Sequence, residues 1–248
     1  MSDLLALDPR YSYYGRTVGL VSPSDGGIDQ LAALTRVQGN SNYAAVSLNE
    51  TTHIKCALET RGLTPLVYRK WEGTSHAVAM ARTIVGKTPL PGDLSLLRVD
   101  ASTPDKTLAS LAQMALTCGV LPSCGEALRG MIKQAVCVAA VEESGRVVSC
   151  AAASAFAHAK HASLADQAWW GMLATAKSHR GQRLSLILGA HALLDMEARF
   201  GFRSFMTGVE PGNLASETVC TRMGLEPGAY NIIGCADPAS LSSGRMTK

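Results

Sequence analysis

The chain is poor in charged and aromatic residues and has no long apolar run. Charged side chains make up 17% of its 248 residues and aromatic ones 5%, whereas 47% are hydrophobic. This composition excludes a disordered chain, which needs low hydrophobicity and high net charge. No run of about 18 uncharged apolar residues offers a membrane span, and residues 1–10 lack the basic and apolar stretches of a secretory signal. We therefore expect a folded, reduced, cytoplasmic protein with no membrane partner.

Signatures of several common sites are also missing. The sequence has neither a GxxxxGKS/T phosphate loop nor the GxGxxG dinucleotide fingerprint. Its seven cysteines are scattered and form no CxxC pair, which removes the main support for a zinc ribbon or a thioredoxin-like protein. The net charge of +3, from 23 basic and 20 acidic residues, is too even to indicate a nucleic-acid partner. We expect neither a metal nor a nucleic acid.

The first part of the chain is the harder one to interpret. Periodicity predicts two helices and a short strand, at Ile28–Val37, His53–Thr60 and Leu66–Tyr68. Turn residues gather at 22–27 and 39–42. Two prolines and a glycine within Thr88–Gly92 disfavour regular structure and predict a linker. We expect an N-terminal segment of unclear fold at 1–92, a domain at 93–237 and a polar tail at 238–248.

After this linker, hydrophobic periodicity predicts a regular succession of elements. Strands are expected at Leu94–Val99, Val136–Val141, Arg146–Phe156, Ala165–Thr175, Ser204–Val209 and Asn231–Gly234. Helices are expected from Thr103 to Gly119 and at Gly125–Gln134, Leu184–Phe200 and Leu214–Met223. Thr103 and Asn213 are the candidate caps, and Pro104 suits the first helical position. The order β-α-α-β-β-β-α-β-α-β is that of a mixed α/β protein with a central antiparallel hairpin.

One basic loop stands out because no carboxylate occurs between Asp166 and Asp195. Lys177, Arg180 and Arg183 lie inside this gap, where a strand ends and the long helix begins. The free backbone N–H groups and the dipole of a helix N-terminus attract anions, and arginines strengthen that attraction. The pattern suits a phosphate or pyrophosphate. Taken alone, it fits a solvated surface loop equally well.

Two motifs in residues 94–235 resemble the GNAT superfamily of acyl-CoA N-acyltransferases. In that family a strand L-x-V leads into the loop R/Q-x-x-G-x-G/A; Leu173 and Thr175 match the strand, and Arg180 opens the loop. Arg183 and Ser185 stand at the two small positions, so Arg183 departs from the usual glycine. The second motif keeps its spacing from Val209 through Asn213 and Ser216 to Gly224, and Leu225 replaces the usual phenylalanine. The resemblance implies the GNAT fold, α/β (α+β), with a mixed, mostly antiparallel central sheet flanked by helices.

The resemblance also implies an activity, namely transfer of an acetyl group from acetyl-CoA to an amine by direct attack. The donor would lie where the strands Ala165–Thr175 and Ser204–Val209 splay apart, with backbone amides near Leu173 and Thr175 bonding its pantetheine arm. The residues implied to bind acetyl-CoA are Leu173, Ala174, Thr175, Arg180, Gly181, Gln182, Arg183, Leu184, Ser185, Asn213 and Ser216.

Candidate catalytic residues follow less directly. Cys220 occupies the position at which many GNAT enzymes have a tyrosine that protonates the leaving thiolate, although a buried structural cysteine is the commoner case. Glu210 is the best-placed candidate base, although a solvated turn residue before Pro211 fits as well. Trp169 stands where some members have a glutamate, and Trp169 and Trp170 should face opposite sides of their strand.

Three of the four histidines in residues 93–237 are weaker candidates. His158 and His161 could face the acceptor, whereas His191 shares the apolar face of its helix. A thiol nucleophile at Cys220 is rejected, because nothing nearby would activate it.

Several alternatives stay open. A non-catalytic GNAT-like module that binds acyl-CoA as a sensor, or that pairs with another protein, is the rival to an enzyme. Residues 1–92 would either complete the acceptor site or be a degenerate partial copy of the same fold. The acceptor amine is unnamed at this point, and a homodimer is an open possibility.

Overall fold

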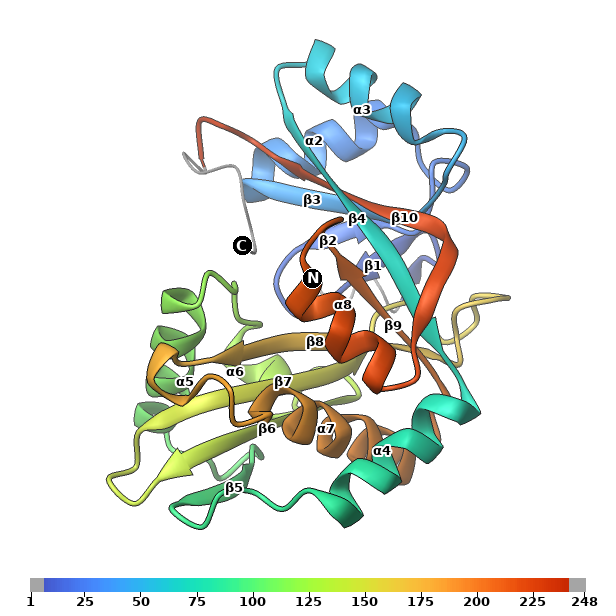
Figure 1. The fold of residues 1–248 in the computed structure, drawn as a ribbon. Coiled ribbons are helices and arrows are strands. Elements are labelled where there is room, and N and C mark those ends of the chain that lie inside the picture. Colours follow the sequence, from blue (N-terminus) through green and yellow to red (C-terminus); the bar gives the residue numbers. More distant parts are fainter. Residues whose placement is uncertain (1–6, 241–248) are drawn as a thin grey trace.

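Ten strands form one continuous sheet in residues 7–240, the part of the chain that the computed structural model describes (Figure 1). From edge to edge the order is β1-β2-β3-β10-β4-β9-β8-β7-β6-β5. The strands are Tyr11–Tyr13 (β1), Val18–Leu20 (β2), Asn40–Ser47 (β3), Thr64–Gly73 (β4), Leu94–Arg98 (β5), Ala135–Glu142 (β6), Val147–Ala155 (β7), Gln167–Thr175 (β8), Ser204–Val209 (β9) and Glu226–Ala236 (β10). Two neighbouring pairs, β2 with β3 and β8 with β9, are parallel, and the other pairs are antiparallel. The mixed, mostly antiparallel sheet is thus confirmed.

Helices cover this sheet in separate groups. They are Ile28–Gln38 (α2), Thr51–Thr60 (α3), Ser75–Lys87 (α4), Asp105–Thr117 (α5), Gly125–Leu128 (α6), Leu184–Phe200 (α7) and Leu214–Arg222 (α8), with a 3-10 turn at Lys177–His179 (η1). Buried side chains of α4, α7 and α8 form one apolar cluster with the sheet, those of α5 and α6 a second, and those of α2 and α3 a third. Among the described residues, no helix is long and apolar enough to cross a bilayer.

The three strands on each side of the contact between β10 and β4 correspond to one another, β2-β3-β10 on one side and β8-β9-β4 on the other. Each half runs through a strand, a helix, a parallel strand, a second helix and a long antiparallel strand: β2-α2-β3-α3-β4 and β8-α7-β9-α8-β10. The last strands are exchanged between the halves, since β4 pairs with β9 and β10 pairs with β3 (Figure 1). Residues 88–92 are irregular, as the prolines predict, but the sheet continues across them.

Most elements after residue 93 lie where periodicity places them, and α7 and β9 have the predicted bounds. The two adjacent tryptophans point to opposite faces, because Trp169 belongs to the cluster under α5 and Trp170 to the cluster under α7. The indole N–H of Trp170 donates to the carbonyl oxygen of Gly189 at 2.8 Å. A side chain at Gly189 would collide with this ring, so α7 depends on that glycine to approach β8 closely.

Some local predictions are wrong. Thr103 does not cap α5; its hydroxyl accepts a hydrogen bond from the backbone N–H of Asp100 at 3.0 Å, and Pro104 is the residue before the helix. The helix predicted up to Gln134 ends at Leu128, because the chain turns at Gly130, with φ of 72°. Residues 40–42 do not form a turn but begin β3, where burial in the sheet overrides their polar character.

The first part of the chain holds elements that the sequence does not reveal. β1, β2, β3 and α4 have no predicted counterpart, and β4 and β10 are much longer than the short strands expected there. The short strands β1 and β2 carry too few residues for an alternating pattern to be legible. They pair with each other, whereas β3 and β4 are placed by β10, which is distant in the sequence.

Candidate functional site

β8 and β9 pair only near their starts. Their parallel register joins Gln167 to Ser204 and Trp169 to Met206, and it ends there. Gln167 holds this closed end, since its Nε2 donates to Ser204 Oγ at 3.3 Å and to Glu72 Oε1 at 3.1 Å. Beyond this point the two strands diverge, in the region where the resemblance implies a cleft.

A bulge in β8 lies beside the divergence. The register between β7 and β8 shifts around Met172, whose φ of 54° lies in the left-handed region. Met172 and Leu173 have no register partner on β7 or on β9. Bulges redirect backbone groups and side chains, and a positive φ at a residue other than glycine is strained and typical of functional sites. The bulge thus frees this stretch of β8 from the ladder and leaves it facing the cleft.

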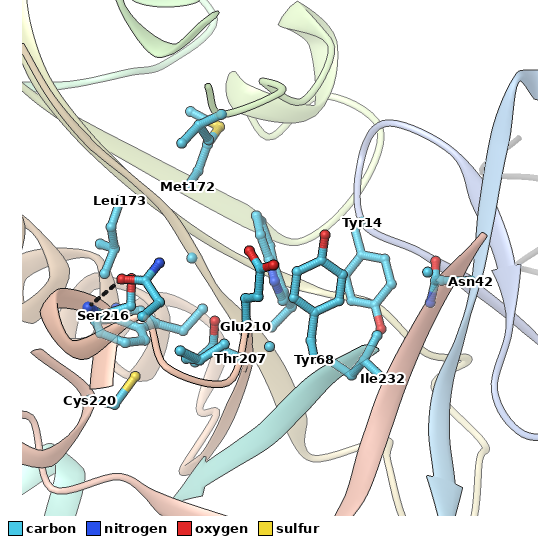
Figure 2. A pocket seen from close by; sticks show the side chains of 18 of the residues that line it. Tyr14, Asn42, Tyr68, Met172, Leu173, Thr207, Glu210, Ser216, Cys220 and Ile232 are labelled. Carbon is cyan, nitrogen blue, oxygen red and sulfur yellow. Dashed lines mark hydrogen bonds between the residues drawn. The ribbon is translucent and has the colours of Figure 1, made fainter. Parts of the chain in front are cut away.

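A pocket fills the space between the diverging strands (Figure 2). One wall comes from β8, β9 and the start of α8, and the other from the N-terminal half and β10. The lining residues are Tyr14, Arg16, Thr17, Asn42, Tyr68, Val120, Trp169, Trp170, Gly171, Met172, Leu173, Thr207, Gly208, Val209, Glu210, Asn213, Ser216, Cys220, Ile232 and Gly234.

The predicted site residues divide between this pocket and the loop that follows β8. Five of them line the pocket: Leu173, Glu210, Asn213, Ser216 and Cys220. The others, Ala174, Thr175, Arg180, Gly181, Gln182, Arg183, Leu184 and Ser185, do not line it and lie at the end of β8, in the loop and at the start of α7.

The loop is exposed and rich in unpaired N–H groups. Residues 180–183 are exposed to solvent. The backbone N–H groups from Gly181 through Ser185 donate to no acceptor among residues 7–240. Gly181 and Arg183 both have positive φ, 84° and 59°, and Arg183 is the residue before α7. Successive N–H groups at a helix N-terminus form a concave donor surface for an anion.

Hydroxyl groups fix the base of this loop to the sheet. The Ser185 and Thr175 hydroxyl oxygens are 2.9 Å apart, and Thr175 Oγ1 is 2.9 Å from Ser149 Oγ on β7. Nε of Arg180 donates to the carbonyl oxygen of Thr175 at 3.4 Å. The start of α7 is therefore held in register with the end of β8.

On α8, the cap and the cysteine have different roles. Oδ1 of Asn213 accepts a hydrogen bond from the N–H of Ser216 at 3.2 Å, so Asn213 caps the helix as predicted. Cys220 is 2% exposed, and burial raises the pKa of its thiol to about 12. At neutral pH the thiol of Cys220 therefore stays protonated. Figure 2 shows Cys220, Ser216 and Leu173 on the same side of the pocket.

Glu210 occupies the middle of the pocket. It follows the last residue of β9 and is partly buried. Figure 2 shows its carboxylate between Thr207 and Tyr68. Unlike Glu210, the histidines considered above, His158, His161 and His191, do not line the pocket. Burial lowers the pKa of His191, in keeping with a packed helix residue.

Five polar or aromatic lining residues come from the N-terminal half and are missing from the sequence-based candidates: Tyr14, Arg16, Thr17, Asn42 and Tyr68. Tyr14 stacks on Phe156, with ring centres 5.3 Å apart, and meets Trp169 edge-on at 5.8 Å. No local motif marks these residues, because strand pairing alone brings β2, β3 and β4 to the cleft. Among residues 7–240, no group of three or more His, Cys, Asp or Glu side chains could hold a metal ion.

Comparisons with solved structures identify the fold. A GCN5-related N-acetyltransferase from Kribbella flavida is 15% identical, with a TM-score of 0.55 over 95% of this chain and 92% of its own. A tandem GNAT protein from the clavulanic acid biosynthesis pathway is 16% identical, with a TM-score of 0.54 over 84% and 67%. A GCN5-related N-acetyltransferase-like protein from Streptococcus suis is 14% identical, with a TM-score of 0.53 over 90% and 81%. No family model and no curated protein matches the sequence.

The chain therefore has the GNAT fold, as its two motifs imply. At identities of 14–16%, the likeness concerns the fold alone.

Proposed function

We propose that this protein is an N-acetyltransferase that moves an acetyl group from acetyl-CoA to an amine. The observation that carries the proposal is the divergence of β8 and β9 around the bulge at Met172, with a donor-rich loop directly after β8. A pyrophosphate needs N–H donors and cations, and the loop offers both in Gly181–Ser185 and Arg180. A pantetheine arm needs an open edge of peptide groups, which Met172 and Leu173 supply.

The residues at the cleft would then have different roles in the reaction. Acetyl-CoA supplies an activated thioester when it binds. The peptide groups of the bulge orient it and polarise its carbonyl, a contribution of about 3 kcal/mol per well-placed donor in other enzymes. Glu210 takes a proton from the attacking amine, which must be neutral to react. Trp169 and Val209, both buried, limit the access of water.

Cys220 remains the candidate proton donor to the departing thiolate. A thiol whose pKa is raised to about 12 holds its proton firmly, which limits its strength as an acid. We therefore expect Cys220→Ala to slow turnover far less than Glu210→Gln. Equal losses would make Cys220 the main acid.

Calorimetry and thiol release test the proposal in two steps. We expect acetyl-CoA to bind with one site per chain, and we expect release of free CoA thiol with at least one member of a panel of primary amines. Tight binding with no thiol release from any amine would favour the rival, a non-catalytic acyl-CoA sensor. Absence of binding would refute both.

We further propose that the N-terminal half is a degenerate partial copy of the same fold. The proposal is supported by the repeated order of elements and the exchange of β4 and β10. In this view, the copy has kept its strands and lost its donor site, and it now provides one wall of the pocket. A second acetyl-CoA site per chain in the calorimetry would contradict it.

A further inference from the structure

A guanidinium group lies in the pocket wall contributed by the N-terminal half. Arg16 follows β1 in the chain and lines the pocket. Its guanidinium carbon lies 5.1 Å from the ring centre of Trp169, which positions the group over the indole face. Nη1 donates to the carbonyl oxygen of Leu121 at 2.7 Å. These two contacts fix the orientation of the group.

This cation has no counter-charge in the described part of the chain. None of the ion pairs found among residues 7–240 includes Arg16. Burial lowers the pKa of Arg16 to about 10, which still leaves it charged at neutral pH. A guanidinium has five N–H donors, and one acceptor, Leu121, is seen. A buried charge without a partner is costly, and a bound anion would relieve that cost.

Two neighbouring polar groups also lack partners. Tyr14 Oη and Asn42 Nδ2 are buried and line the same pocket; the Asn42 amide lies close to the Tyr14 hydroxyl, but neither atom makes a well-aligned hydrogen bond among residues 7–240. Burial raises the pKa of Tyr14 more than the nearby Asn42 amide lowers it, so its hydroxyl keeps its proton and can donate. Arg16 lies within electrostatic reach of Tyr14. Arg16, Tyr14 and Asn42 therefore present N–H and O–H groups at one end of the pocket that could bind an acceptor, and Arg16 is cationic.

We propose that the acceptor substrate carries a carboxylate, which Arg16 binds with the help of Tyr14 and Asn42. The proposal rests on the acetyltransferase function, because it assigns this end of the pocket to the acceptor amine. The planar fork of arginine matches a carboxylate in two parallel hydrogen bonds. Glu210 lies in the middle of the same pocket, where the amine of such a substrate would meet it. The substrate class is therefore amino acids and related amino carboxylates, rather than polyamines.

Matched ligand pairs test this assignment without knowledge of the natural substrate. The probes are N-acetylglycine, N-acetylalanine, N-acetylleucine and N-acetylphenylalanine, each compared with its own carboxamide. Binding is followed by tryptophan fluorescence, because Trp169 contacts Arg16, on the full chain with and without CoA. In at least one pair we expect the acid to bind about tenfold or more tightly than its amide.

Three arginine variants give the comparison its control. Arg16→Gln retains a donor for Leu121 and should abolish the preference for the acid, whereas Arg16→Lys should keep part of it. Arg203→Gln removes an exposed arginine outside the pocket and should leave the preference intact. Thermal unfolding of each variant verifies that it is folded.

The outcomes distinguish failure of the carboxylate site from failure of the proposed acetyltransferase function. If no acid binds better than its amide, or if Arg16→Gln keeps the full preference, the carboxylate site is wrong even where acetyl-CoA binds and thiol is released. If acids are preferred through Arg16 but acetyl-CoA does not bind, the anion site stands and the acetyltransferase proposal fails.

Discussion

Each half of the sheet contains a parallel β-α-β unit, but the unit in the first half is closed by packing and the unit in the second half opens at a pocket. β2, α2 and β3 form a parallel β-α-β unit in the first half, and β8, α7 and β9 form another in the second. In the first half the chain stays paired beyond the register, because the N–H of Ala45 donates to the carbonyl oxygen of Val21 at 2.8 Å. In the second half a bulge at Met172 ends the pairing and a pocket opens.

The turns between strand and helix differ in the same sense. In the first half the Tyr43 hydroxyl donates to the carbonyl oxygen of Gly26 at 2.8 Å, and a side chain at Gly26 would collide with Leu20. Asp25 and Asp29 place carboxylates at that helix start. In the second half a side chain at Gly181 would meet nothing. One turn is packed and acidic, whereas the other is open and basic.

The comparison teaches that fold order alone does not make a site. The same succession of elements forms part of the core when the two parallel strands stay paired and large side chains fill the space at the turn between strand and helix. It becomes a cleft when a bulge breaks the ladder and the following turn carries no acid.

The largest effect is expected at the residue that follows the second strand of each parallel pair. This residue is Glu210 after β9 in the second half and the exposed Leu48 after β3 in the first half. Glu210→Gln removes the proposed base and should lower kcat by about 1000-fold, with acetyl-CoA binding unchanged. Because Leu48 has no carboxylate, the matched control is Glu50→Gln, two residues further along the first half. This change affects only a surface hydrogen bond from Ser47. Steady-state thiol release measures both. A loss below threefold would remove Glu210 from the mechanism.

The next effect concerns the packed crossing. Leu58 is fully buried in the N-terminal cluster, so Leu58→Ala should lower the free energy of unfolding by about 3 kcal/mol. Because β4 and β10 are exchanged, we expect tryptophan fluorescence and circular dichroism to report one common transition in urea. The exposed Leu48 serves as control, and Leu48→Ala should change stability by about 0.5 kcal/mol or less. Two separate transitions would show that the halves unfold independently.

Charge at the two turns gives a third contrast. Arg180→Glu places a carboxylate in the open turn and should weaken acetyl-CoA binding about 30-fold in calorimetry. In the packed turn, Asp25→Asn with Asp29→Asn should create no second binding site, because Leu20 and Tyr43 already fill it. Unchanged affinity after Arg180→Glu would assign the donor to another part of the surface.

The last effect, a dependence of stability on pH, concerns the place where the halves meet. Lys133, next to β6, donates to the carbonyl oxygen of Tyr13 in β1, and burial lowers the pKa of Lys133 to about 7. Between pH 7 and about 10 the unfolded chain therefore binds a proton that the folded chain does not, so stability rises with pH by up to about 1.4 kcal/mol per unit. Lys133→Met should remove that rise, measured as the wild-type minus variant difference in urea unfolding. Identical pH slopes would mean that Lys133 titrates normally.

Much of the second half was predictable because its signals are local. The bounds of α7 and β9, the Asn213 cap and the opposite faces of Trp169 and Trp170 all follow from periodicity within a few turns of chain. Leu173, Glu210, Ser216 and Cys220 also line the pocket, since the motif spacing fixes their places on β8, directly after β9 and on α8.

The pocket residues contributed by the N-terminal half could not be predicted from the spacing of residues in the sequence. Arg16 and Tyr14 precede their pocket neighbour Trp169 by about 150 residues, and the strands that carry Asn42 and Tyr68 reach the cleft through the exchange of β4 and β10. No periodicity reports a pairing between such distant segments. The prediction of a cap at Thr103 fails for a different, local reason, because the Thr103 hydroxyl is hydrogen-bonded to Asp100, three residues earlier.

By itself, the sequence determined the order of elements after residue 93, the basic turn without carboxylates and the two motifs of the GNAT fold. These depend on neighbours along the chain. The tertiary structure alone decided that the first half shares the sheet, that the bulge at Met172 opens β8 from β9, and that an unpaired arginine faces the pocket. These depend on strand pairing and burial, which are set by contacts between residues far apart in the chain.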